Sequence, residues 1–96
     1  MMTKRIPCSV TLGQPLKLEV ESLAGSGYRW TITTPQTEAW KVLDFNTALD
    51  PIKGATTLVW RVMMLRVGSW NIVCRRQRPW EKEPVEERIF EISVEP

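Results

Sequence analysis

Apolar and polar residues alternate with a period of two along most of this 96-residue chain. The alternation is clearest at Leu16–Val20 and returns at Leu58–Met64, Trp70–Cys74 and Phe90–Val94. A period of two is typical of strands that bury one face, and no segment sustains a helical period. Glycine- and proline-containing turn signals recur about every ten residues, as in sandwich folds. The sequence therefore predicts an all-β, immunoglobulin-like antiparallel β-sandwich of about seven strands with essentially no helix.

The length suits one domain with one core, so we expect residues 1–96 to form a single unit. The inward positions of the alternating segments predict the core residues Leu18, Val20, Trp30, Trp60, Val62, Trp70, Ile72 and Phe90. Two regions are less regular. Trp40–Phe45 is apolar without a clear period, and Asn46–Gly54 is expected to be a loop because it carries turn-forming residues.

Composition excludes several classes of function. The net charge is +2, from 13 Lys and Arg against 11 Asp and Glu, which is too weak to favour nucleic acid or an anionic membrane. No run of about 18 apolar residues is present, so we expect no membrane span. The segment Met1–Ile6 starts positively but no apolar stretch follows, so we expect no signal peptide in this chain. The compartment stays open: periplasmic or secreted if a signal was removed, otherwise cytoplasmic. The oligomeric state also stays open.

The residues for catalysis and metal binding are sparse. The chain has no histidine, so a Cys or Ser nucleophile would lack its usual base. Cys8 and Cys74 lie on inward positions of separate predicted strands, and we expect both to be buried and reduced, although spacing alone leaves a disulfide open. Two thiols on different strands do not form a zinc site. We expect no enzyme and no cofactor, because the acidic cluster Glu81–Glu87 has no pocket-forming pattern around it.

The tripeptide Arg78-Pro79-Trp80 lies between two predicted strands and is the strongest candidate binding motif. Proline restricts the loop, and an exposed tryptophan on a stiff loop loses little entropy when it binds a partner. The alternative is that Trp80 folds back onto the edge of the sandwich. Arg75 and Arg76 extend a small cationic patch from Arg78, which at Arg75 is better explained as a solvated strand face.

A second loop, Leu23–Gly27, contains two glycines around Ser26. Glycine permits positive φ and a close approach by another molecule. The alternative is a plain connection between sheets that needs glycine for steric reasons. A nucleophile elbow is excluded because Ala24 stands where that motif needs glycine. A phosphate-binding loop is excluded because no helix follows.

The segments Gly27-Tyr28-Arg29-Trp30 and Arg78-Pro79-Trp80, with the glycine turn at Gly68 between them, resemble the chagasin family of cysteine-peptidase inhibitors. The resemblance covers nearly the whole chain. It implies an immunoglobulin-like sandwich whose three loops at one end block papain-like cysteine peptidases. It thus implies a papain-like peptidase as partner, bound by the residues Gly25, Ser26, Gly27, Tyr28, Gly54, Ala55, Arg78, Pro79 and Trp80.

The chain departs from the family pattern in two loops. Leu23-Ala24-Gly25 stands where the family has Asn-Pro-Thr, whose threonine lies closest to the catalytic cysteine of the peptidase. The second loop, glycine-rich in the family, keeps only Gly54. An alternative function is therefore a non-inhibitory interaction module that uses the same loops on another partner. In either case the loops Leu23–Gly27, Asp50–Thr56 and Arg78–Glu83 are expected at one end of the sandwich.

Overall fold

The computed structural model describes residues 1–23, 27–35, 37–50, 52 and 55–96. Across these ranges the chain forms seven strands and no helix. No described segment is a helix long and apolar enough to cross a membrane. The strands are β1 (Met2–Thr11), β2 (Pro15–Leu23), β3 (Arg29–Ile32), β4 (Trp40–Asp50), β5 (Ala55–Met64), β6 (Gly68–Gln77) and β7 (Glu86–Glu95).

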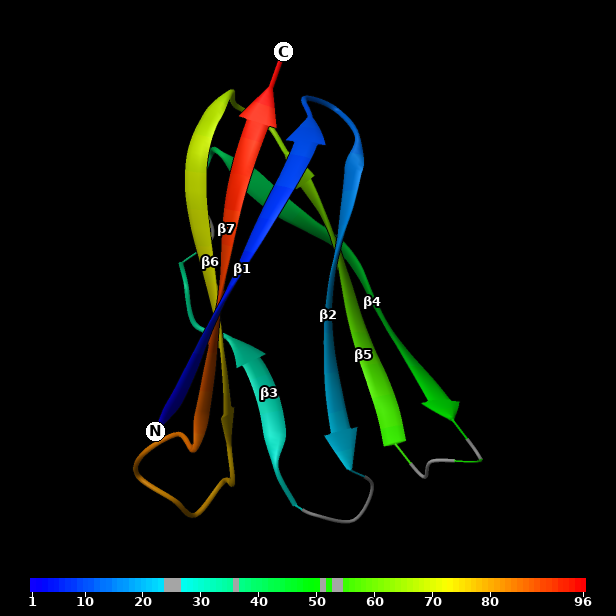
Figure 1. Cartoon of the computed structure of the whole chain (residues 1–96), viewed down its shortest axis with the longest axis vertical. Helices are drawn as coiled ribbons and strands as arrows, with labels where there is room; N and C mark the ends of the chain where they lie inside the picture. Colours follow the sequence, from blue (N-terminus) through cyan, green and yellow to red (C-terminus); the bar gives the residue numbers. More distant parts are fainter. Residues whose placement is uncertain (24–26, 36, 51, 53–54) are drawn as a thin grey trace.

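The strands form two sheets that face each other (Figure 1). One sheet has the order β1-β7-β6-β3 and the other has the order β2-β5-β4. The prediction of a seven-stranded immunoglobulin-like sandwich is confirmed. Neighbouring strands are antiparallel except β1 and β7, which are parallel with Ile6 opposite Phe90. The exception follows from strand count: successive strands reverse direction, so the first and the seventh run the same way.

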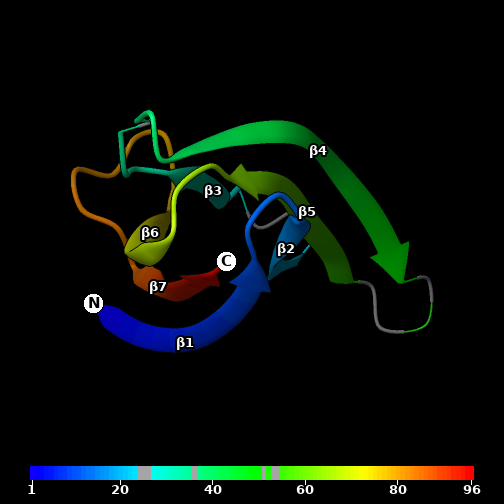
Figure 2. The same ribbon diagram turned by 90° about the horizontal axis from the view of Figure 1, so that it is seen from above.

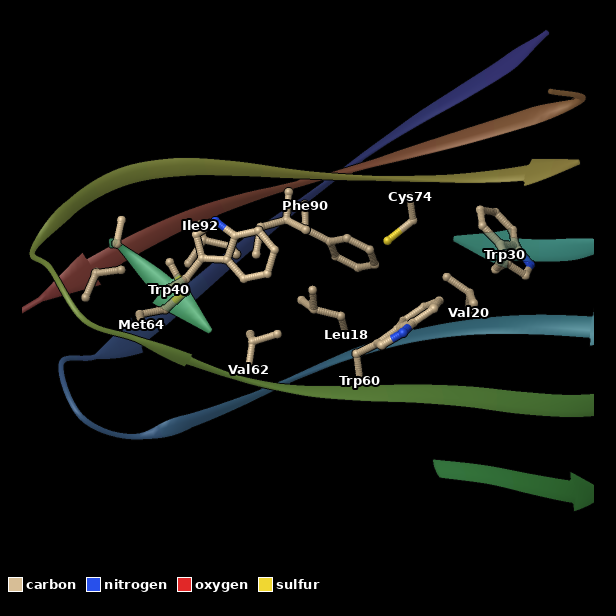
Figure 3. Close-up of a cluster of buried hydrophobic side chains, with 13 residues drawn as sticks. Leu18, Val20, Trp30, Trp40, Trp60, Val62, Met64, Cys74, Phe90 and Ile92 are labelled. Atoms are coloured by element: carbon tan, nitrogen blue, oxygen red, sulfur yellow. The ribbon is translucent and has the colours of Figure 1, made fainter. Parts of the chain in front are cut away.

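The core lies between the two sheets (Figure 3). Seven of the eight predicted core residues are buried: Leu18, Val20, Trp30, Trp60, Val62, Ile72 and Phe90. Burial also includes other inward positions of the same alternating segments, namely Met64, Cys74, Ile92 and Val94. Each fully buried aliphatic or aromatic side chain contributes roughly 1.5–3 kcal/mol relative to its exposed state. The alternation therefore accounts for most of the core.

Trp70 is the predicted core residue that the structure places differently. It is half-buried and packs against the edge of the core, while its indole N–H donates to the carbonyl of Arg66 at 3.1 Å. Trp40 is the fully enclosed tryptophan at this end, near Met64 and Ile92 (Figure 3). Trp70 stays at the surface because a polar partner for its indole N–H lies there.

The prediction of a loop over Asn46–Gly54 is wrong for the first half of that range, because β4 continues to Asp50. A register shift between Val42 and Asp44 in the β4–β5 ladder explains the missing alternation. Such a bulge adds a residue to one strand and changes the phase of its faces. Beyond the shift, the ring of Phe45 meets that of Trp60 with centroids 5.4 Å apart.

Both cysteines are free. Cys74 is buried as predicted, whereas Cys8 is half-buried because β1 is an edge strand. The register places Cys8 opposite Ile92 and Cys74 opposite Arg88 on β7, which runs between their strands. Strands two places apart are about 10 Å apart, beyond the reach of a disulfide. The fold therefore excludes a bond between the two thiols.

Candidate functional site

Three connections share one end of the sandwich, at the bottom of Figure 1. The end of β2 and the start of β3 lie between the β6–β7 connection and the adjacent ends of β4 and β5. Even-numbered strands all run toward this end, so the connections that follow them meet there. The expected clustering of the three loops is confirmed for their flanking strand ends.

Six of the nine predicted binding residues lie in the described part of the chain. They are Gly27, Tyr28, Ala55, Arg78, Pro79 and Trp80. The other three, Gly25, Ser26 and Gly54, lie outside the described residues. The geometry of the candidate site therefore comes from the third loop, from the strand-proximal end of the first loop and from the start of β5.

The third loop begins with a tight turn at Arg78-Pro79-Trp80-Glu81. The amide of Glu81 donates to the carbonyl of Arg78 at 3.1 Å, which closes the turn. Proline suits its second position because φ is preset there. Trp80 occupies the third position without a positive φ, which makes the turn type I rather than type II. The turn holds Trp80 outward, where 72% of its surface is exposed.

The first and third loops touch at Gly27. Gly27 has φ +80°, and a Cβ added there would stand 3.3 Å from Cη2 of Trp80 and 4.0 Å from Nε of Arg78. The positive φ favours glycine here, and a methyl group at this position would crowd the tip of the indole ring. The alternative in which Trp80 folds back onto the sandwich is therefore wrong. Its ring reaches the neighbouring loop and stays largely exposed.

Tyr28 lies between two arginines. The guanidinium of Arg78 lies 4.2 Å from the centroid of the Tyr28 ring, and that of Arg76 lies 4.9 Å from it. The same group of Arg78 lies 5.8 Å from the centroid of Trp80. Cation–π contacts of this kind stabilise by about 0.5–1 kcal/mol each at exposed sites. Arg78 therefore bridges the aromatic side chains of the first and third loops.

The predicted cationic patch is divided between two faces and is balanced by carboxylates. Arg75 points to the outer face, where its Nε donates to Glu87 at 2.8 Å. Arg76, one residue later, points between the sheets, as strand alternation requires. The ion pairs of Arg76 and Arg78 with carboxylates are 3.2 Å to Glu86 and 3.6 Å to Glu81. The patch therefore offers little net charge for attracting an acidic partner.

The second predicted loop is shorter than expected, because Ala55 is already the first residue of β5. Ala55 pairs with Leu23 at the end of β2 and with Asp50 at the end of β4. It therefore contributes an ordered strand end to the site. Figure 2 shows the adjacent ends of β4 and β5 set to one side, away from the β6–β7 connection.

Sequence reasoning did not recognise the support that three residues give beneath the site: Arg76 was assigned to the cationic patch, Glu86 to the acidic cluster, and Arg88 was not singled out. All three lie on inward positions, continuing the series through Cys74 on β6 and through Phe90 on β7. Glu86 is the buried charged residue of the described chain, with 7% of its surface exposed. The alternation of β6 and β7 already places these residues on the inward face. The prediction of the core considered only apolar residues at inward positions.

The two thiols of the chain are poor candidates for a nucleophile. Burial raises the pKa of the Cys74 thiol to about 12, and burial also raises the pKa of the Cys8 thiol. Thiols with raised pKa values are poor nucleophiles at neutral pH. Over the described residues no three His, Cys, Asp or Glu side chains are grouped to hold a metal ion.

Comparison with solved structures identifies similar folds. The chain resembles the cysteine protease inhibitor EhICP2 from Entamoeba histolytica with a TM-score of 0.79 and 19% identity, over 97% of this chain and 92% of that one. It resembles PbICP-C, solved in complex with falcipain-2, with a TM-score of 0.77 and 18% identity, over 97% and 89% of the two chains. For amebosin the TM-score is 0.62 at 14% identity, over 98% and 97%.

No curated protein matches the chain in sequence. The family model described as Chagasin family peptidase inhibitor I42 matches residues 9–94, which is nearly the whole chain. The match spans all three connections at the loop end, from the end of β2 to the start of β7. The chain therefore belongs to the chagasin family, a family of peptidase inhibitors and not of enzymes.

Proposed function

We propose that this chain inhibits papain-like cysteine peptidases by covering the active-site cleft with the loop end of its sandwich. The observation that carries the proposal is the exposure of Trp80, 72%, on a turn that Pro79 stiffens. Exposed aromatic side chains held in one position are typical of residues that dominate binding energy. Membership of an inhibitor family supplies the function that this surface serves.

The mechanism is occlusion. The first loop, with Gly25 and Ser26, lies over the catalytic cysteine and offers backbone groups and a small hydroxyl without presenting a bond that can be cut. Trp80 packs against the rim of the cleft. Gly54 and Ala55 contact the rim on the other side of the first loop. The position of the end of β2 and the start of β3, between the β6–β7 connection and the adjacent ends of β4 and β5, supports this division of roles.

Rigidity of the loops favours affinity. Ordering a flexible side chain on binding costs about 0.5–1.5 kcal/mol. In the third loop much of that ordering exists before binding, because the turn is closed by the Glu81–Arg78 hydrogen bond and the guanidinium of Arg78 lies 5.8 Å from the Trp80 ring centroid. The fold of PbICP-C, which was solved as a complex with falcipain-2, supports a peptidase partner for this loop end.

The test is inhibition of a panel of papain-like enzymes by wild-type protein and by Trp80→Ala, with melting temperatures for both. Truncating a dominant interface tryptophan costs at least ~2 kcal/mol, or roughly a thirty-fold loss in affinity. Stability should hardly change, because the side chain is exposed. Trp80→Phe is the control, since it keeps an aromatic ring on the same turn and should retain most of the inhibition.

Two results would contradict the proposal. Lost stability with unchanged inhibition would show that Trp80 supports the fold and not the partner. Absence of inhibition across the panel would favour the alternative of a non-inhibitory interaction module. The replacement of Asn-Pro-Thr by Leu23-Ala24-Gly25 is the feature that favours that alternative.

A further inference from the structure

A column of alternating arginine and aromatic side chains runs from the exposed end of the site into the sandwich. Its guanidinium-to-ring distances, from the surface inward, are 5.8, 4.2, 4.9, 6.0 and 5.0 Å. The arginine–aromatic column consists, in this order, of Trp80, Arg78, Tyr28, Arg76, Trp30 and Arg88. Its inner members, Trp30, Arg76 and Arg88, come from β3, β6 and β7, which pair in that order at this level, and its outer members come from the adjoining loops.

Glu86 joins the two arginines at the inner end of the column. Its Oε1 lies 3.2 Å from Nη2 of Arg76, and its Oε2 accepts from Nε of Arg88 at 3.0 Å. With 7% of its surface exposed, Glu86 is shielded from solvent screening. Each carboxylate oxygen therefore orients one guanidinium against the ring of Trp30.

The arginine–aromatic column depends on the carboxylate of Glu86 for its charge balance. Arg76 and Arg88 carry like charges on the same indole, and without Glu86 they would repel each other in a largely buried space. The Nε of Arg76 is buried without a hydrogen-bond partner in the described part of the chain, so the ion pair with Glu86 is what orients this guanidinium. Trp30 is held separately, since its indole N–H donates to the carbonyl of Glu21 at 3.2 Å.

The backbone links the same residues to the third loop. The amide of Val85, next to Glu86, donates to the carbonyl of Arg76 at 2.9 Å and so closes the base of the loop. Further along, the side-chain amide of Gln77 donates to the carbonyl of Glu81. A shift of Arg76 would therefore reach Trp80 by two routes, through the stacked rings and through the base of the loop.

We propose that Glu86 is a positioning residue for inhibition: by holding Arg76 and Arg88, it sets the presentation of Tyr28 and Trp80 at the binding surface. The inference rests on the proposed function, and it adds a residue that itself lies away from the partner. Glu86 acts through the column, and only the outer end of the column meets a peptidase.

The experiment compares Glu86→Gln with Glu87→Gln. The control removes the neighbouring carboxylate, which pairs with Arg75 at 2.8 Å on the outer face of the same strand. Three quantities are measured: the melting temperature, the inhibition constants on papain-like enzymes, and hydrogen exchange of the Glu81 and Val85 amides in the free protein. For Glu86→Gln we expect faster exchange at both amides and about tenfold weaker inhibition, the size expected for losing a charge-assisted contact. Glu87→Gln should match wild type in exchange and inhibition.

A second variant, Arg76→Lys, decides the matter if Glu86→Gln does not fold. Lysine keeps the positive charge opposite Glu86 but has no planar group to stack between Tyr28 and Trp30. It should again speed exchange at Glu81 and Val85 and weaken inhibition. Wild-type exchange and inhibition in the folded variants would overturn the proposal. If wild-type protein inhibits no enzyme, the proposed function fails, while the exchange data still decide whether Glu86 positions the loop.

Discussion

Gly27 lies near the tip of the Trp80 indole, close enough that a Cβ on Gly27 would stand 3.3 Å from Cη2 of the ring. This approach brings together residues 53 positions apart in the sequence (80 − 27), and the absence of a side chain on Gly27 leaves room for the ring of Trp80. Because Gly27 also has φ +80°, the position depends on glycine for two separate reasons.

Replacing Gly27 by alanine should therefore have two effects. The positive φ should reduce the free energy of unfolding by about 1 kcal/mol. The added methyl group should also displace Trp80 and weaken peptidase inhibition by about tenfold, a loss comparable to one well-made contact. Thermal unfolding and inhibition constants measure the two effects separately.

Gly13→Ala is the matched control. Gly13 has φ +85° in the turn between β1 and β2, at the opposite end of the sandwich, and no atom lies within 4 Å of an added Cβ. The control should lose similar stability and keep full inhibition. Equal weakening of inhibition by both variants would show that lost stability, and not a displaced Trp80, is responsible.

Alternation predicted which residues of β2, β5, β6 and β7 face the core, because burying one face of a strand imposes a period of two. It carries no information on pairing direction, so the parallel pairing of β1 with β7 was not predicted. It also fails where the backbone departs from regular geometry. The register shift between Val42 and Asp44 hid the length of β4 for this reason.

The candidate site likewise has one part that could be predicted from the sequence and one part that could not. Arg78-Pro79-Trp80 was predictable because proline and an exposed tryptophan act locally. The support beneath it was not, because Arg76 and Glu86 contradict the rule that inward residues are apolar. Only the pairing of β6 with β7 brings their opposite charges together, and pairing depends on the whole fold.

The replacement of threonine by glycine in the first loop gives a second prediction. The family resemblance places a threonine nearest the catalytic cysteine, where this chain has Gly25, a position outside the described residues. Gly25→Thr should strengthen inhibition by about 1 kcal/mol, roughly fivefold, if the restored hydroxyl makes one hydrogen bond. Gly25→Ala, which stiffens the loop without a hydroxyl, should give a smaller gain. Equal inhibition by wild type and a folded Gly25→Thr variant would contradict the assignment of this loop to the catalytic cysteine.

The ion pair between Asp44 and Arg61 predicts a pH dependence of stability. The side-chain hydrogen bond from Arg61 lowers the pKa of Asp44 below its ordinary 3.8, and Nε of Arg61 lies 2.9 Å from the carboxylate. A lowered pKa in the folded state means that the stabilisation is present above pH 3.8 and is lost as the pH falls through the folded value. Because the pair is at the surface, the effect should be small and should weaken in salt.

Urea unfolding of wild type and Asp44→Asn at several pH values measures this contribution. The difference in unfolding free energy should be greatest near neutral pH and should shrink as Asp44 becomes protonated. Glu38→Asn is the control, since it removes the carboxylate of a more exposed ion pair, the one between Glu38 and Arg66. A wild-type advantage that persists unchanged at the lowest pH would contradict the role of the Asp44 charge.

The two thiols should react at different rates. With a pKa raised to about 12 by burial, Cys74 has a thiolate fraction on the order of one in ten thousand at pH 8. Cys8 is half-buried on an edge strand and should react first with a thiol reagent. In a Cys8→Ala variant, which leaves Cys74 as the remaining thiol, labelling should be slow in the native protein and rapid in urea. Mass spectrometry of the labelled protein over time follows both reactions. Rapid labelling of Cys74 in the folded variant would contradict its burial in the core between the two sheets.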